Sequence, residues 1–350
     1  MSRPLEAAAR PSGMHGDSTN VGVVVIGRNE GERLRRCLLS VQGTACAVIY
    51  VDSGSTDGSV AAAKALGAEV VELDTSIPFS AARARNAGLE RFVELVPAAE
   101  FVLFVDGDCE VAEHFATVGR RALLDDVRVA AVAGRLRERF PERSLYNRLC
   151  DMEWAVPPGE VKSCGGIALF RVSALREAGA FNPRVVAGEE PELCVRLRQR
   201  GWTIKRVADD MATHDAAMTR FSQWWKRAVR AGHAYAEGAA LHGHWPERHF
   251  VRESLSGWLY GFFVPAVILA AVLAISRWAL VAGLFYPLLL VRIASGRRRS
   301  HRDSWKHAFL YAGACLLAKP AECWGQARYW IRRILRRPPQ IIQHKAVSSG

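Results

Sequence analysis

Asp106 and Asp108 lie one residue apart in the segment FVLFVDGDC, directly after a run of apolar residues. Such a run is typical of a buried strand, and ligands of open α/β sheets bind beyond the carboxyl ends of the strands. Two carboxylates at a strand end can jointly hold a hard divalent cation through oxygen ligands. That cation would stabilise the charge that grows on a departing diphosphate. A solvated turn with aspartate caps is the alternative, because D-G-D is itself typical of turns.

Two further strand ends carry polar residues of the same kind. The segment VIYVDSGSTDGS places Asp52 after an apolar run and before a loop of glycine and serine. A carboxylate there can accept a hydrogen bond from a base N–H or a ribose hydroxyl. The turn at 27–30, with the sequence GRNE, follows the first apolar run. No G-x-G-x-x-G begins there, since the segment continues as GRNEGERL. The dinucleotide-binding fingerprint is therefore excluded at this position.

The elements that must position these side chains alternate between strand and helix. Short apolar runs predict strands, and apolar residues at helical spacing predict helices between them. We expect strands at 21–26, 47–51, 68–73 and 100–105, and helices at 32–41, 57–66 and 80–95. Further along we expect strands at 129–138, 165–171 and 202–207, and helices at 146–154, 173–178, 191–199 and 218–241. This order predicts an α/β domain with a mostly parallel sheet.

Five motifs in order carry a resemblance to a known family. They are VVVIGRNEGERL, VDSGSTDGS, AARARNAGL, FVDGDCEV and GEEPELCVRL, and they span roughly residues 21–210. Together they resemble the family 2 glycosyltransferases, which have the GT-A fold, a Rossmann-like α/β fold with a mostly parallel mixed sheet. The resemblance implies an inverting enzyme that uses a nucleotide-sugar donor, usually a UDP- or GDP-sugar, together with Mg²⁺ or Mn²⁺.

The resemblance also implies roles for individual residues. Glu30, Asp52 and Arg85 would bind the donor. Asp108 would lie closest to the metal, and Asp106 nearer the ribose. The acidic motif of the family falls on Gly188-Glu189-Glu190, where Glu190 stands at the usual position of the catalytic Asp. The choice of base between Glu189 and Glu190 stays open, since acids are favoured at any helix N-terminus.

Three more positions are candidates for the site. Some GT-A enzymes complete the metal shell with a His at the place of His214, although a solvated side chain beside Asp215 is equally expected. Gly165 and Gly166 resemble the glycine pair that borders the acceptor pocket, where backbone without Cβ can approach a sugar; a simple turn is the alternative. Trp224 could form an acceptor platform, or it could pack its helix onto the domain.

The last hundred residues differ in composition from the rest. The net charge is +12, and residues 251–350 hold 15 basic and 3 acidic residues, so they account for all of it. Nucleic-acid binding is disfavoured, because the excess lies beside apolar segments and not on the α/β domain. Residues 255–275 are uncharged and long enough to cross a bilayer core of about 30 Å. A second apolar run at 279–291 is followed by GRRRSHR, which favours the cytoplasmic face.

The sequence therefore predicts four parts. We expect a disordered N-terminus (1–20), a GT-A domain (21–245), a transmembrane hairpin (252–293) and a basic interfacial helical tail (296–340). The predicted protein lies in the inner membrane with its catalytic domain facing the cytoplasm. It would transfer a sugar to a lipid-linked acceptor of the polyprenyl type, or to a polysaccharide. The product would be a surface polysaccharide or a glycolipid.

Three other functions stay open. The first is a sugar-phosphate nucleotidyltransferase, which would need a richer glycine loop after the first strand. The second is a catalytically silent membrane partner that keeps the fold. The third is a polyprenyl-phosphate sugar synthase, whose acceptor is already an anion and needs no base.

Overall fold

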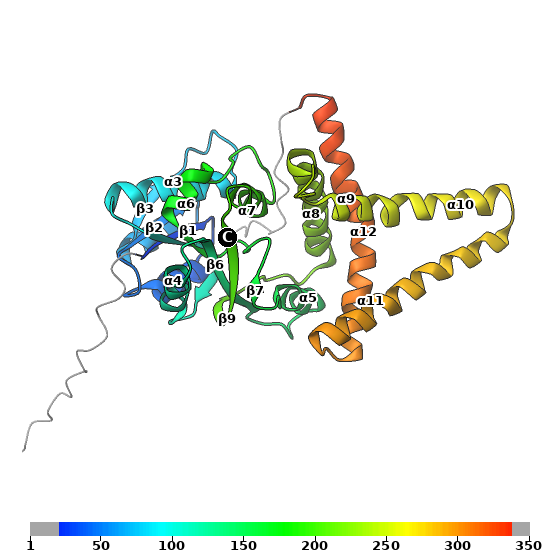
Figure 1. Ribbon diagram of the computed structural model, residues 1–350, viewed down its shortest axis with the longest axis horizontal. Helices are drawn as coiled ribbons and strands as arrows, with labels where there is room; N and C mark the ends of the chain where they lie inside the picture. Colours follow the sequence, from blue (N-terminus) through cyan, green and yellow to red (C-terminus); the bar gives the residue numbers. More distant parts are fainter. Residues whose placement is uncertain (1–20, 338–350) are drawn as a thin grey trace, which may run out of the picture.

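The computed structural model describes residues 21–337. The N-terminus expected to be disordered (1–20) and the last residues of the expected tail lie outside the described residues. Within them the strands form one nine-stranded sheet in the order β3-β2-β1-β4-β8-β6-β9-β5, with β7 paired to β9. Helices cover the sheet, and the C-terminal helices extend away from it (Figure 1).

The α/β domain begins with the expected alternation. Its first elements are β1 (Val21–Gly27), α1 (Glu32–Val41), β2 (Ala47–Asp52), α2 (Ser59–Ala65), β3 (Glu69–Glu72), α3 (Ala81–Leu95) and β4 (Phe101–Asp106). β1 pairs in parallel with both β2 and β4, and β2 pairs in parallel with β3. Val23, Val24 and Val25 of β1 are fully buried, as a continuous apolar run requires in a central parallel strand.

The second half of the domain makes the sheet mixed. It contains β5 (Cys109–Val111), α4 (Phe115–Asp125), β6 (Val129–Glu138), α5 (Leu145–Trp154), β7 (Gly159–Glu160), β8 (Ala168–Arg171), α6 (Val172–Ala178), α7 (Glu189–Gln199), β9 (Thr203–His214) and α8 (Phe221–His242). β8 lies antiparallel between β4 and β6, and β9 pairs in parallel with β6. The expected GT-A fold, a mostly parallel mixed sheet, is confirmed.

Several boundaries differ from the prediction. The glycine-led start of the strand expected at 165–171 is a loop, because β8 begins only at Ala168. The strand expected at 202–207 continues to His214 through register shifts against β6. Helix α4 and strand β5 were not predicted. These differences matter for the site, because β5 and the extended end of β9 pair directly.

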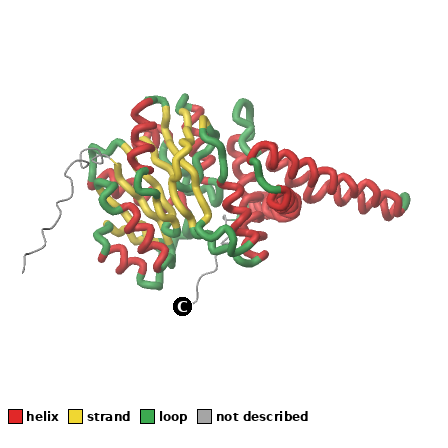
Figure 2. Tube along the Cα trace, turned by 90° about the horizontal axis from the view of Figure 1, so that it is seen from below, coloured by secondary structure: helices red, strands yellow, loops and turns green. Residues whose placement is uncertain are grey.

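The C-terminal part is helical. It comprises α9 (Val251–Trp258), a π-helical turn (Leu259–Phe263), α10 (Val264–Ala274), a 3-10 segment (Arg277–Leu284), α11 (Phe285–His301) and α12 (Trp305–Ile334). The arms of α10 and α11 diverge from a shared tip (Figure 1), and the turned view shows the same helices projecting from the domain (Figure 2). Two continuous helical stretches, Val251–Ala274 and Arg277–His301, are long and apolar enough to cross a membrane.

Helix α12 joins this hairpin to the α/β domain. Glycines allow close crossings on its two sides. A Cβ on Gly232 of α8 would lie 2.0 Å from the backbone of Glu322, and a Cβ on Gly261 would lie 2.3 Å from the carbonyl oxygen of Lys319. Any larger residue would push these helices apart. The hairpin is therefore fixed to the α/β domain through α12 and α8, which lie side by side (Figure 1).

Candidate active site

The ends of three parallel strands meet at one edge of the sheet. Gly27 at the end of β1 is in register with Asp52 of β2, and Ile26 is in register with Asp106 of β4. Asp52 and Asp106 therefore flank β1 from either side. The turn after β1 is tied to the loop after β2, because Asn29 donates its N–H to Ser55 Oγ at 2.9 Å.

Asp52 organises the loop that follows it. The residue is 2% exposed, and its Oδ2 accepts hydrogen bonds from the N–H groups of Gly54 and Ser55 at 2.9 and 2.8 Å. Tyr50 donates its hydroxyl to Asp52 Oδ1 at 2.8 Å. Burial, together with the charge of Asp52, raises the pKa of Tyr50, so this donor keeps its proton. Asp52 thus holds the loop beside the strand ends in one shape.

Next to this loop lies a small cavity of about 100 Å³. It runs along the ends of the first three strands, and its lining includes Arg28, Ser53, Asp74 and Arg83. Arg83 also donates to the carbonyl oxygen of Asp74 at 2.7 Å. Two guanidinium groups thus border the cavity beside Asp52, which is a suitable setting for a group that carries negative charge.

Arg85 links the strand edge to helix α7. It is 3% exposed and donates to Asp106 Oδ1 at 3.0 Å and to Glu189 Oε1 at 2.7 Å. Burial alone would lower the pKa of Arg85, but Asp106 and Glu189 more than offset it and raise the pKa. Although burial opposes it, the charges of Arg85 and Arg230 lower the pKa of Glu189. Glu189 is therefore an anion locked in an ion pair, which does not suit a proton acceptor.

The loop before β8 approaches this ion pair closely. Arg85 donates to the carbonyl oxygen of Gly166 at 3.2 Å. A Cβ on Gly166 would lie 3.1 Å from Asp106 Oδ2 and 3.2 Å from the guanidinium of Arg85. Gly165 has φ +93°, which favours glycine. The two glycines also line a cavity of about 410 Å³ that Trp154 and Arg206 border from other elements.

Asp108 meets His214 across the β5–β9 pairing. Cys109 of β5 is in register with His214, and His214 Nε2 lies 3.3 Å from Asp108 Oδ2. Asp108, Cys109 and His214 offer ligand atoms within 4.8 Å of one another. The ring of His214 packs edge-on against Trp154, with the centroids 4.8 Å apart. Oxygen and imidazole donors at this spacing fit Mn²⁺, and the carboxylates also fit Mg²⁺.

Glu190 lies in a buried cluster of its own. It is 5% exposed, and its Oε1 accepts hydrogen bonds from the Cys164 N–H at 2.7 Å and from the thiols of Cys164 and Cys194 at 3.0 and 2.9 Å. Burial raises the pKa of Glu190. A carboxylate with a raised pKa takes up a proton more readily than an ordinary one. The cluster also fixes the Cys164-Gly165 backbone to the start of α7.

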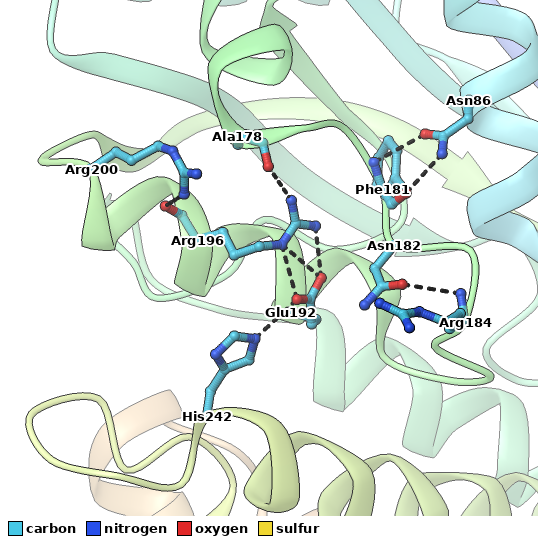
Figure 3. Close-up of polar contacts among 9 residues, drawn as sticks. All are labelled: Asn86, Ala178, Phe181, Asn182, Arg184, Glu192, Arg196, Arg200 and His242. Atoms are coloured by element: carbon cyan, nitrogen blue, oxygen red, sulfur yellow. Dashed lines mark hydrogen bonds and ion pairs between the residues drawn. The ribbon is translucent and has the colours of Figure 1, made fainter.

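Helix α7 is held in place by polar contacts on its far side (Figure 3). Arg196 makes a two-pronged pair with Glu192, with Arg196 Nη2 2.7 Å from Glu192 Oε2, and His242 Nε2 of α8 lies 2.9 Å from Glu192 Oε1. Asn86 of α3 accepts the N–H of Phe181 at 3.0 Å and donates to its carbonyl oxygen at 2.7 Å. The His242 contact joins α7 to α8, and the Asn86 contacts fix the loop before α7 to α3.

The structure thus brings most of the predicted site residues together, and Trp224 lies on helix α8. Trp224 is 5% exposed and stacks on Tyr146 of α5, with the ring centroids 6.4 Å apart. Packing was the alternative considered for Trp224, but the residue also lines a cavity of about 590 Å³ beside α12, so an acceptor-side role stays a prediction. Glu30 is paired with Arg33 at 2.8 Å in the turn that follows β1.

Two buried residues of the site were not identified from the sequence. Glu138 at the end of β6 lies with its Oε2 3.8 Å from His214 Nδ1 and accepts the N–H of Ala216 at 3.1 Å. Arg206 of β9 donates to the carbonyl oxygen of Cys164 at 3.1 Å. Neither residue belongs to a recognisable motif, and both contact residues that lie far away in the sequence. The only local signal was that each is a charged residue within a predicted strand.

Comparison with known proteins agrees with this geometry. Residues 22–178 match the family model Glycosyl transferase family 2. This part of the chain, just under half of its length, is therefore similar to a family 2 glycosyltransferase domain. An uncharacterized glycosyltransferase of Rickettsia bellii is 33% identical over 94 residues, which are 27% of this chain and 29% of the relative. The match thus spans less than a third of that curated relative.

One solved structure resembles the chain in fold, and a second matches it at a lower score. A mannosyltransferase from Pyrobaculum calidifontis, in complex with GDP-Man and Mn²⁺, has a TM-score of 0.55 and 19% identity, with 92% of this chain and 90% of that chain covered. Glucosyl-3-phosphoglycerate synthase from Mycobacterium tuberculosis, in complex with Mn²⁺, UDP and glucosyl-3-phosphoglycerate, has a TM-score of 0.45 and 20% identity over 69% of this chain and 88% of that chain.

Proposed function

We propose that this family 2 glycosyltransferase domain is an active inverting enzyme that moves a sugar from a nucleotide-sugar donor to a membrane-associated acceptor. The observation that carries the proposal is the continuous polar chain from Asp106 through Arg85 to Glu189, beside the Asp108–His214 pair and Glu190. A packing role alone would not require five charged groups at one sheet edge, because burying such groups is costly.

Each residue then has a role in donor binding. The loop held by Asp52 and the cavity beside it would bind the nucleoside. Asp106, Asp108 and His214 would hold Mg²⁺ or Mn²⁺, which supplies positive charge to the donor diphosphate. Arg85 fixes the orientation of Asp106, and a Cβ at Gly166 would crowd both side chains. Within this proposal a UDP-sugar is the first donor to test, and GDP-sugars come next.

Glu190 would act on the acceptor. It accepts the proton of the acceptor hydroxyl while that oxygen forms a bond to the anomeric carbon. The bond from that carbon to the diphosphate oxygen breaks on the opposite face, so the configuration inverts. Of the two glutamates, Glu190 is better suited to this step, because burial raises its pKa while Glu189 is committed to Arg85.

The position of the domain at a membrane is part of the proposal. The two apolar helices support an anchor, and Arg297 at the domain end of α11 donates to the carbonyl oxygen of Met152 at 2.7 Å. Arg298 and Arg299 follow it in the sequence. Basic residues at this end favour a cytoplasmic catalytic domain on the inner membrane. We therefore propose a polyprenyl-linked acceptor, used in surface polysaccharide or glycolipid synthesis.

A transfer assay tests the proposal. Purified full-length protein is incubated with radiolabelled UDP- or GDP-sugars, Mn²⁺ and a lipid extract of bacterial membranes, and label in the organic phase is counted. The Asp108→Asn variant is the matched control, since it keeps the side-chain shape. Metal-dependent transfer by the wild type and none by the variant is expected. No release of nucleotide by the wild type with any donor would favour a catalytically silent protein.

A further inference from the structure

A third cavity, larger than the two at the strand ends, lies between the α/β domain and helix α12. Its volume is about 590 Å³, within the range usual for small-ligand sites, and its walls come from α5, the start of α7, α8 and α12. Most of this wall lies beyond residues 22–178, the part that matches the family model. The cavity is therefore a feature of this chain's own C-terminal half.

One wall of the cavity is the start of the helix that carries the glutamates. Gly188 lines the cavity and directly precedes Glu189. It has φ +81°, and a Cβ there would lie 3.3 Å from the Cβ of Ala234 in α8. Arg230 of α8 lines the cavity too and is close enough for its charge to act on Glu189. A ligand in the cavity would thus lie next to the proposed site of transfer.

The opposite wall leads to the apolar hairpin. Tyr311 and Lys319 of α12 line the cavity, and the backbone of Lys319 touches the π-helical turn at Gly261. That turn runs directly into α10, where Leu269 and Leu273 are 59% and 79% exposed. An amphiphile could therefore place its head group in the cavity and its chain along the hairpin.

The cations of the cavity differ in their partners. Arg227 is paired with Glu153 at 2.6 Å, and Lys319 is paired with Glu322 at 2.8 Å. Arg230 differs from these two residues, because it makes no hydrogen bond or ion pair to any residue within 21–337. A guanidinium that lines a cavity and makes no hydrogen bond or ion pair there is well suited to a phosphate, which it can bind through two parallel hydrogen bonds.

We infer that this cavity binds the phosphate group of a lipid-linked acceptor, and that Arg230 is the residue that holds it. The inference rests on the proposed glycosyltransferase function and adds to it the chemical class of the acceptor head group. Phosphate bound here would orient the acceptor beside Glu190, with the lipid chain directed towards α10. Arg227 and Lys319, each already neutralised, would shape the cavity and not supply its free charge.

Binding of simple amphiphiles tests the inference without knowledge of the true acceptor. Dodecyl phosphate is titrated into full-length protein in a neutral maltoside detergent, and its affinity is measured by calorimetry for the wild type, Arg230→Gln and Lys226→Gln. Lys226 is an exposed cation one turn earlier on α8 and serves as the matched control. The affinity should fall by roughly 10- to 100-fold in Arg230→Gln, as for a lost charge-assisted hydrogen bond, and stay unchanged in Lys226→Gln.

A second arm separates the lipid from the phosphate. Inorganic phosphate should bind at least tenfold more weakly than dodecyl phosphate; equal affinities would overturn the assignment to a lipid. Equal affinity of the wild type and Arg230→Gln for dodecyl phosphate would overturn the role of Arg230. In the same Arg230→Gln sample, metal-dependent binding of the nucleotide should persist. If the wild type also fails to bind the nucleotide with metal, that result counts against the proposed function and not against phosphate binding in this cavity.

Discussion

Replacement of Glu190 by Gln separates chemistry from structure at the proposed site. The amide keeps an oxygen that can accept the 2.7 Å hydrogen bond from the Cys164 N–H, so the Cys164-Gly165 backbone should stay in place. The variant cannot take up the acceptor proton. Loss of a general base costs about 10²- to 10⁴-fold in rate, or about 3 to 5 kcal/mol at about 1.4 kcal/mol per factor of ten. Donor affinity should not change.

Glu192 provides the matched control, because it is a buried glutamate of the same helix with a different role. Its carboxylate accepts from Arg196 and lies 2.9 Å from His242 Nε2. Glu192→Gln should therefore lower the free energy of unfolding by about 1 to 3 kcal/mol while leaving the transfer rate per folded molecule near that of the wild type.

Glu190 and Glu192 should also change the free energy of unfolding with pH in opposite directions. The pKa of Glu190 is raised by burial, so the folded state binds more protons than the unfolded state. Its contribution to stability is therefore lost as pH rises from the ordinary carboxyl pKa through the raised one. Although burial opposes it, hydrogen bonds from Arg196 and His242 lower the pKa of Glu192. Its contribution is present above the ordinary carboxyl pKa and is lost as pH falls through the lowered one.

The assay combines single-turnover transfer with thermal unfolding between pH 4 and pH 8. The wild-type rate should fall on the acid side as Glu190 becomes protonated, and that limb should be missing in Glu190→Gln. A wild-type rate in Glu190→Gln would refute its role as the base. That result would favour a polyprenyl-phosphate sugar synthase, whose acceptor phosphate needs no base.

Three further predictions follow from the contacts of the site and of the hairpin. Arg85→Gln removes the buried guanidinium that Asp106 and Glu189 share, so the free energy of unfolding should fall by about 1 to 3 kcal/mol; a change below about 0.5 kcal/mol in denaturant titration would contradict this. Gly166→Ala should weaken donor binding at least about tenfold in calorimetry, because its Cβ would crowd Asp106; wild-type affinity would argue against a tight approach. Leu269→Arg with Leu273→Arg should move the protein from the carbonate-resistant membrane pellet to the supernatant, and full retention in the pellet would contradict a membrane-spanning α10.

Much of the fold could be predicted because its central strands are buried on both faces. The runs in β1, β2 and β4 are continuous and apolar, and this pattern depends only on local sequence. Helix α4 was missed because its buried face relies on Ala116, Gly119 and Ala122, whose small side chains give a weak periodic signal. The end of β9 was missed because Asp209 and Asp210 interrupt the apolar pattern where the strand is irregular.

The site could be predicted as a set of residues but not as a set of contacts. Asp108 and His214 meet only because β5 pairs with β9, and neither β5 nor that part of β9 was predicted. Arg85 reaches Glu189 from 104 residues away, and no local pattern reports such a pair. The choice between Glu189 and Glu190 likewise needed their surroundings, since two adjacent glutamates look the same in a sequence.

Donor binding is the measurement that tests the central claim most directly. Purified full-length protein and its Asp108→Asn variant are heated with UDP-, GDP- and dTDP-sugars, each with Mn²⁺ or with a chelator. We predict that one nucleotide raises the Tm of the wild type only when Mn²⁺ is present, and that the variant shows no such rise. An equal, metal-dependent rise in Asp108→Asn would contradict the metal site. No rise with any nucleotide in the wild type would contradict the claim that this sheet edge binds a nucleotide-sugar.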